Sequence, residues 1–68
     1  MNLEQKLLKA FVKYMLDKYN EKYNESDLLI TVPDDWEIEY ECQITNNNTA
    51  FDVLFTKTCK VKEVIEIF

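Results

Sequence analysis

The chain has 68 residues, 47% of them hydrophobic and 31% charged, and its formal net charge at pH 7 is −5. This apolar content is too high for a disordered chain, and apolar runs such as 28–30 are far shorter than the ~20 residues that cross a bilayer. We therefore expect one domain, 1–68, with no membrane contact.

The residue types that the sequence lacks exclude several kinds of site. There is no His, no Gly and no Arg, so all eight basic residues are Lys. His is the commonest general base, Gly forms phosphate-binding loops, and Arg binds phosphates through two parallel hydrogen bonds. We therefore expect no enzyme, no cofactor, no metal site and no direct binding of nucleic acid. The first residues also lack the order of a signal peptide, which predicts a cytoplasmic protein.

Residues 2–22 have the periodicity of an amphipathic helix. When they are placed at about 100° intervals, the apolar side chains share one broad arc and most Lys and Asp side chains lie opposite. The arc is wider than one face of a sheet requires. The polar residues 20–26 should end the helix and form the link to the next element.

The two segments that follow have the patterns of β-strands. Residues 28–32 are rich in β-branched side chains, and 36–45 alternate between apolar and polar side chains. Between them, Pro33 and the two Asp after it favour a tight turn. That turn would place Val32 opposite Trp36, with the apolar side chains of both strands on one face.

A third strand is predicted over 50–58, after an Asn-rich turn. If Thr45 lies opposite Ala50, the apolar side chains of this strand join the same face. The prediction is an α+β fold, with an N-terminal helix packed on an antiparallel meander of three strands. The centre of its core should be formed by Phe11, Trp36, Ile38 and Phe55.

The last segment, 61–67, is ambiguous. The spacing of Val61 and Val64 fits a short helix, whereas the β-branched content favours a fourth strand. That strand would have one apolar face, made by Val61, Ile65 and Ile67. We favour the strand and keep the short helix as the alternative.

A row of carboxylates is the most specific feature of the sequence. On a strand, alternate side chains point the same way at spacings of ~6.8 Å, so the row would lie on the face opposite the apolar one. One interpretation is a solvated outer face. The other is a binding surface for a basic region of a protein partner, formed by Asp34, Asp35, Glu37, Glu39 and Glu41.

The apolar edge of the helix is a second candidate interface. Part of its width fills the core, and the remainder could contact a partner protein or a second copy in a weak homodimer. The residues concerned are Val12, Leu16, Tyr19 and Tyr23.

The two cysteines and three of the helix lysines fit structural roles. Cys42 and Cys59 match no metal-binding motif and are predicted to be small core residues. In the predicted pairing they lie roughly 20 Å apart, too far for a disulfide. Lys6, Lys9 and Lys13 form a ridge that we interpret as a solvated helix face.

Charge is divided unevenly along the chain and suggests a function. Residues 1–22 carry a net charge of +2 and residues 23–68 carry −7. We expect a non-enzymatic inhibitor or regulator that binds a basic, nucleic-acid-handling protein. In size and charge the chain is similar to the anti-CRISPR and anti-restriction proteins of phages and mobile elements. The alternative is a host adaptor or subunit, homodimeric or not, with no inhibitory role.

Overall fold

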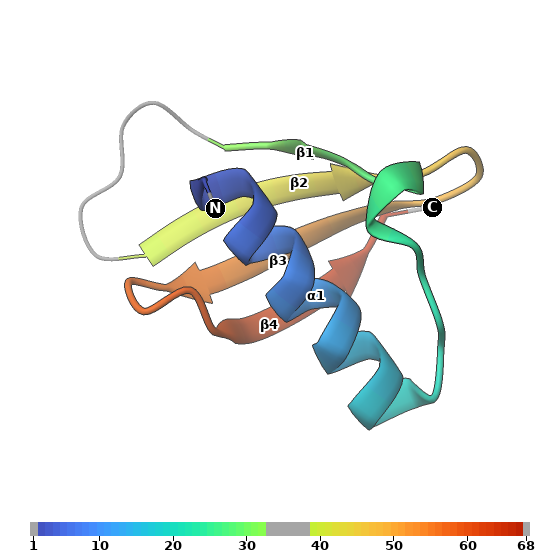
Figure 1. Cartoon of the computed structure of the whole chain (residues 1–68), viewed down its shortest axis with the longest axis horizontal. Helices are drawn as coiled ribbons and strands as arrows, with labels where there is room; N and C mark the ends of the chain where they lie inside the picture. The colour runs from blue at the N-terminus through green and yellow to red at the C-terminus, as the bar shows by residue number, and fades with distance from the viewer. Residues whose placement is uncertain (1, 33–38, 68) are drawn as a thin grey trace.

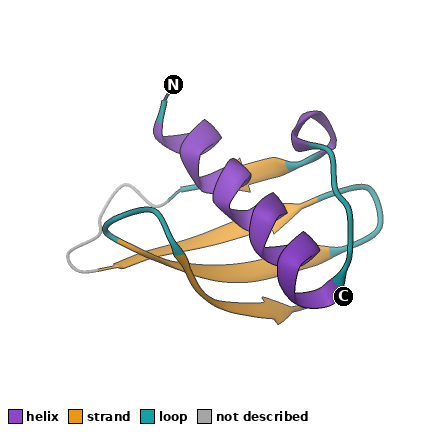
Figure 2. Cartoon of the chain, turned by 60° about the horizontal axis from the view of Figure 1, so that its bottom comes forward, coloured by secondary structure: helices purple, strands orange, loops and turns teal. Residues whose placement is uncertain are grey.

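The protein, as a computed structural model that describes residues 2–32 and 39–67, has an α+β fold (Figure 1). In the described residues, one α-helix packs on a four-stranded antiparallel sheet with the strand order β1-β2-β3-β4. The elements are α1 (Leu3–Tyr19), a short 3-10 helix (Glu25–Asp27), β1 (Leu29–Thr31), β2 (Glu39–Thr45), β3 (Ala50–Thr56) and β4 (Val61–Glu66). The helix covers one face of the sheet (Figure 2).

The ends of α1 are set by two asparagines. The side chain of Asn2 accepts a hydrogen bond from the backbone N–H of Gln5, and the Gln5 side chain accepts one from the Asn2 N–H, which is a capping box. At the other end, Asn20 adopts a left-handed conformation with φ 57°, and its N–H donates to the carbonyl of Leu16. The prediction of a helix over 2–22 was therefore too long at its C-terminal end.

The β2–β3 hairpin has the predicted register. Thr45 pairs with Ala50 and Cys42 pairs with Val53. The turn depends on Asn46, whose side-chain oxygen accepts hydrogen bonds from the N–H groups of Asn48 and Thr49 at 3.1 and 3.0 Å. It also accepts one from the Thr49 hydroxyl at 2.8 Å.

The predicted register of the first hairpin was wrong. Ile30 pairs with Ile44, six residues further along β2 than the predicted Ile38, and the predicted partner of Val32, Trp36, lies outside the described residues. A shift by an even number preserves which face each side chain takes. The predicted faces therefore survive, with Ile30 beside the fully buried Ile44.

The fourth strand is confirmed, but its predicted apolar face was wrong. β3 ends at Thr56 rather than at 58, and β4 turns back to pair with it. Across from β3, Phe55 pairs with Val61 and Leu54 pairs with Glu63, so a bulge adds one residue between them. After the bulge, Val64 lies on the helix side, opposite the buried Val53, and Ile65 lies on the other face.

The core lies between α1 and the sheet. Leu7, Phe11 and Met15 are the buried residues of the helix. The ring of Phe11 lies 5.3 Å from that of Phe51 and 5.9 Å from that of Tyr23, so aromatic contacts tie the helix to β3 and to the link. Phe55 is also fully buried, as predicted. The other two predicted core residues, Trp36 and Ile38, lie outside the described residues.

Candidate binding surface

The face of the sheet opposite α1 carries Glu41, one member of the predicted carboxylate row. Cys42 and Ile44 point into the core, so Glu41, which precedes Cys42 on β2, points to the opposite face and is exposed. Glu41 pairs with Leu54, and the backbone of Glu39 pairs with Thr56. Both pairings agree with the sequence-based register. The other predicted members, Asp34, Asp35 and Glu37, lie outside the described residues.

The pairing of β3 with β4 adds carboxylates that the sequence pattern did not identify. Glu63 pairs with Leu54 on the side opposite Glu41, which gives the transverse order Glu41, Leu54, Glu63. Because neighbouring strands are about 4.8 Å apart, the two Glu backbones are roughly 10 Å apart. Asp52 lies in the next row, between Gln43 and Ile65.

These residues line a shallow pocket that defines what we call the outer sheet face. The pocket is lined by Glu41, Asp52, Val53, Leu54, Glu63 and Ile65. Carboxylates from three strands thus surround the aliphatic side chains of Leu54 and Ile65. An isolated acidic row was predicted from the sequence, whereas the structure has an acidic surface with an apolar centre.

Aliphatic exposure extends beyond the pocket. The exposed fractions of Leu29, Ile65 and Ile67 are 75%, 54% and 43%. Leu29 pairs with Thr45, and Ile67 donates a 2.7 Å backbone hydrogen bond to Ala50, so both lie near the end of the sheet where the β2–β3 turn is. Exposed apolar side chains that gather on one surface are typical of interaction sites.

The predicted interface on the helix is only partly exposed. Val12 and Tyr23 are half-buried and pack against the core. Leu16 and Tyr19, with exposed fractions of 44% and 50%, remain at the surface. The packing of Val12 against the core accounts for part of the helix's wide apolar arc, whereas Tyr23 lies in the link after α1.

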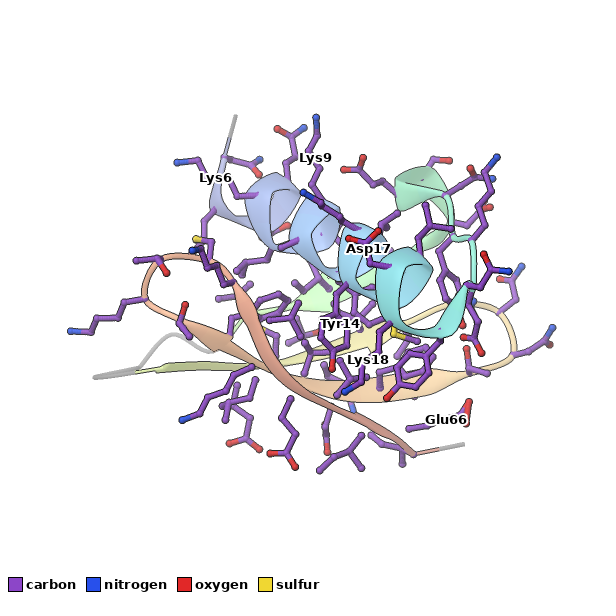
Figure 3. All side chains as sticks on the ribbon, turned by 90° about the horizontal axis from the view of Figure 1, so that it is seen from below. Lys6, Lys9, Tyr14, Asp17, Lys18 and Glu66 are labelled. Carbon is purple, nitrogen blue, oxygen red and sulfur yellow. The ribbon has the colours of Figure 1, made fainter. Side chains whose placement is uncertain are left out.

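A cluster of two tyrosines and a lysine lies along the β4 side of the helix. The ammonium of Lys18 donates a 2.9 Å hydrogen bond to the hydroxyl of Tyr14 and lies 5.3 and 5.5 Å from the ring centres of Tyr14 and Tyr19. In Figure 3, Tyr14 and Lys18 point from the helix towards β4. The hydrogen bond to Tyr14, followed by charge interactions with both tyrosines, raises the pKa of Lys18 above its usual 10.5.

A second pocket lies between the C-terminal end of α1 and β4. Its lining combines apolar side chains with two carboxylates, from Met15, Tyr19, Glu21, Phe51, Val64 and Glu66. The hydroxyl of Tyr23 donates a 2.9 Å hydrogen bond to Glu21. Burial, this hydrogen bond, and the charges of Glu21 and Glu66 raise the pKa of Tyr23 to about 12. The charges of both pocket carboxylates, Glu21 and Glu66, therefore act on the hydroxyl of Tyr23.

The basic ridge of the helix lies on the side of the molecule opposite the outer sheet face. Lys6, Lys9 and Lys13 are exposed, and Figure 3 shows Lys6 and Lys9 pointing away from the sheet. The acidic outer sheet face and the basic helix ridge are therefore separated by the whole thickness of the domain. That separation gives the surface two regions of opposite charge.

The two cysteines are free and differ in their surroundings. Cys42 is buried in the core, and this burial raises the pKa of its thiol to about 11. Cys59 is half-buried in the turn between β3 and β4, where it has a positive φ of 63°. Cys59 lies in a turn rather than in the predicted strand pairing, because β3 ends at Thr56.

The described residues also bear on metal binding and on membrane insertion. None of their His, Cys, Asp and Glu side chains form a group of three or more that could hold a metal ion. No helix among them combines the length and hydropathy needed to cross a membrane.

Comparison with known proteins gives no relative from which a role could be transferred. No protein-family model, curated protein or solved structure matches this chain.

Proposed function

We propose that this chain is a non-enzymatic binding protein whose outer sheet face engages a basic surface of a protein partner. One observation carries the proposal: Glu41, Asp52 and Glu63 come from three strands and surround the half-buried side chain of Leu54 and the exposed side chain of Ile65. An apolar centre with a charged rim is the usual organisation of a protein interface. The rim is acidic, which favours a partner rich in Lys or Arg.

The sequence extends this charge towards the start of β2. The predicted members Asp34, Asp35, Glu37 and Glu39 precede Glu41 in the chain. They contribute to the −7 net charge of residues 23–68, which would attract a basic partner from a distance. A protein that covers a basic surface competes with any nucleic acid that uses it, so the proposed role is inhibition or regulation.

Catalysis is not part of the proposal. Two carboxylates act as acid and base only when their environments separate their protonation. Glu41 and Glu63 are both exposed on an open face, so burial does not distinguish them. The sequence has no His or Arg that could complete a site.

The proposal is tested with two variants of equal net charge. The face variant combines Glu41→Gln, Asp52→Asn and Glu63→Gln. The helix variant combines Glu4→Gln, Asp17→Asn and Glu25→Gln, which are exposed residues outside the sheet. Each variant changes the net charge from −5 to −2. Differences between the variants therefore report the place of the charge and not its amount.

Immobilised wild type and both variants are exposed to a lysate of the source cells. The proposal predicts a basic protein that wild type and the helix variant retain and the face variant loses, and that nucleic acid displaces. Equal capture by all three forms would show that the outer sheet face is not the binding surface. Circular dichroism of each variant checks that the fold is intact.

A second candidate function, an adaptor or subunit that binds through the helix, is favoured by the exposure of Leu16 and Tyr19. The same capture experiment distinguishes this candidate from binding through the outer sheet face. A Leu16→Glu variant would then lose the captured protein, and the face variant would retain it.

A further inference from the structure

On the basis of the proposed function, we propose that the outer edge of β4 binds an extended, lysine-bearing segment of the partner as an added strand. β4 is the last strand of the sheet, and within the described residues no strand pairs with its other side. The opposite edge strand, β1, has only three residues, whereas β4 has six. An exposed edge strand presents unpaired backbone groups to which another chain can add.

The backbone groups that point outward can be assigned from the hydrogen-bond pattern. The N–H of Ile67 donates to the carbonyl of Ala50 in β3. In an antiparallel pair, alternate residues direct their backbone groups towards the same neighbour. Ile65 and Glu63 therefore bond to β3 as Ile67 does, and Val64 and Glu66 direct their N–H and carbonyl groups to the outer edge.

The two halves of β4 differ in their protection. Proteins commonly block an edge with a β-bulge and with Lys side chains. Both devices lie in the first half of β4, where the bulge follows Val61 and where Lys62 is found. The second half, from Glu63 to Glu66, has a regular register with β3.

The helix completes a site beside this second half. In Figure 1 the last turn of α1 extends past β4, the last strand of the sheet. Beneath it lies the pocket of Met15, Tyr19, Glu21, Phe51, Val64 and Glu66. A strand added to β4 would place alternate side chains in this pocket. The apolar lining suits the aliphatic stem of a lysine, and Glu21 and Glu66 suit its ammonium group.

Charge distinguishes a basic segment from a second copy of this chain. Glu21, Glu63 and Glu66 are exposed around the open half of β4. Lys18 is already bound to Tyr14 at 2.9 Å. Two copies, each with a net charge of −5, would repel one another, whereas a Lys-bearing segment is attracted.

The test uses a short synthetic peptide of alternating Val and Lys and measures amide hydrogen exchange by NMR on the whole chain. The added strand should slow the exchange of the Val64 and Glu66 amides by at least roughly 10-fold at saturation. The amide of Ile30 is the internal control, because it points outward from β1 at the opposite edge. It should not change.

Two matched comparisons isolate the backbone contribution. The same peptide, N-methylated at alternate residues in each of the two possible phases, keeps its charge and loses donors on one side or the other. The N-methylated peptide that has lost the donors facing β4 should no longer protect the amides of Val64 and Glu66. In the protein, Glu66→Pro removes an outward N–H and should abolish the protection of the Val64 amide. Glu66→Gln removes only the charge, so the peptide should bind less tightly and its affinity should depend less on salt.

Several outcomes would overturn the inference. If both N-methylated peptides protect Val64 as the parent peptide does, no backbone pairing occurs. If the peptide instead slows the amide exchange of Glu41, Gln43 and Asp52 alone, it binds the outer sheet face. The proposed function then survives without an added strand. If Val64 and Glu66 are protected without peptide and lose protection on dilution, a second copy occupies the edge.

Discussion

Replacement of Phe11 is expected to remove most of the stability of this domain. Its side chain is fully buried and in ring contact with Phe51 and Tyr23. Truncation of a buried Phe to Ala costs about 3–5 kcal/mol of stability. Each aromatic pair contributes about 0.5–1.5 kcal/mol beyond the burial of its area. A domain of this size has a net stability of roughly 3–5 kcal/mol. Phe11→Ala should therefore be largely unfolded at room temperature.

A milder substitution makes the expectation measurable. Phe11→Leu keeps much of the volume and loses the ring contacts, which should cost about 1–1.5 kcal/mol. With a urea dependence of about 1 kcal/mol per M for so small a domain, the unfolding midpoint should fall by about 1–1.5 M. Leu29→Thr, at an exposed position, should change stability by no more than about 0.5 kcal/mol. A midpoint for Phe11→Leu equal to that of wild type would refute the assignment of Phe11 to the core.

Three further predictions concern the C-cap of the helix, the reactivity of the two cysteines and stability at alkaline pH. Asn20→Ala should destabilise the fold by about 1–2 kcal/mol, because Ala tolerates the left-handed C-cap poorly; an unchanged urea midpoint would argue against that cap. In the native protein, a thiol reagent at neutral pH should modify Cys59 readily and Cys42 only after unfolding, because Cys42 is buried and its thiol pKa is about 11; two equally fast thiols would contradict this burial. Stability should also fall at alkaline pH. Burial raises the pKa of Cys42 from 9.0 to about 11, and burial with the Glu21 hydrogen bond raises that of Tyr23 from 10.0 to about 12. The unfolded chain therefore releases these protons first, so their stabilisation is complete below about pH 9 and is lost as the pH rises through about 12. Urea midpoints that are equal at about pH 8 and about pH 11 would exclude this linkage.

The β2–β3 hairpin could be predicted from the sequence because two independent signals agree. The alternation of apolar side chains fixes the faces of both strands, and the Asn-rich turn fixes the number of residues between Thr45 and Ala50. Asn46 supplies the turn's hydrogen bonds in a chain that has no Gly. Each signal alone would allow several registers.

The first hairpin could not be predicted in the same way. Alternation has a period of two, so it cannot distinguish Ile38 from Ile44 as the partner of Ile30. The turn-forming residues after Val32 suggested the nearer partner. The observed pairing instead places Ile30 beside Ile44 and brings Leu28 into the core.

The apolar face of β4 was mispredicted because of the bulge. Val61 and Val64 both contact the core, although a spacing of three places side chains on opposite faces of a regular strand. In the sequence, this spacing resembled a helix. It is the pattern that one extra residue produces in a strand, so the same two valines signal the bulge.

The candidate surface was predictable only along β2. The outward position of Glu41 follows from alternation within one strand. The neighbouring positions of Glu63 and Ile65 depend on the register of β4, which the bulge shifts. The acidic row was therefore visible in the sequence, whereas its combination with an apolar centre required the fold.

The salt dependence of the association rate tests the central claim most directly. The captured partner is mixed rapidly with wild type, the face variant or the helix variant at several ionic strengths. Complementary charge near an interface accelerates association, and salt screens the effect over about 10 Å at 0.1 M. The proposed function predicts that the face variant associates more slowly at low salt and depends less on salt, while the helix variant behaves nearly as wild type does. Equal rates and equal salt slopes for the two variants would contradict it, because the position of the charge would then have no effect.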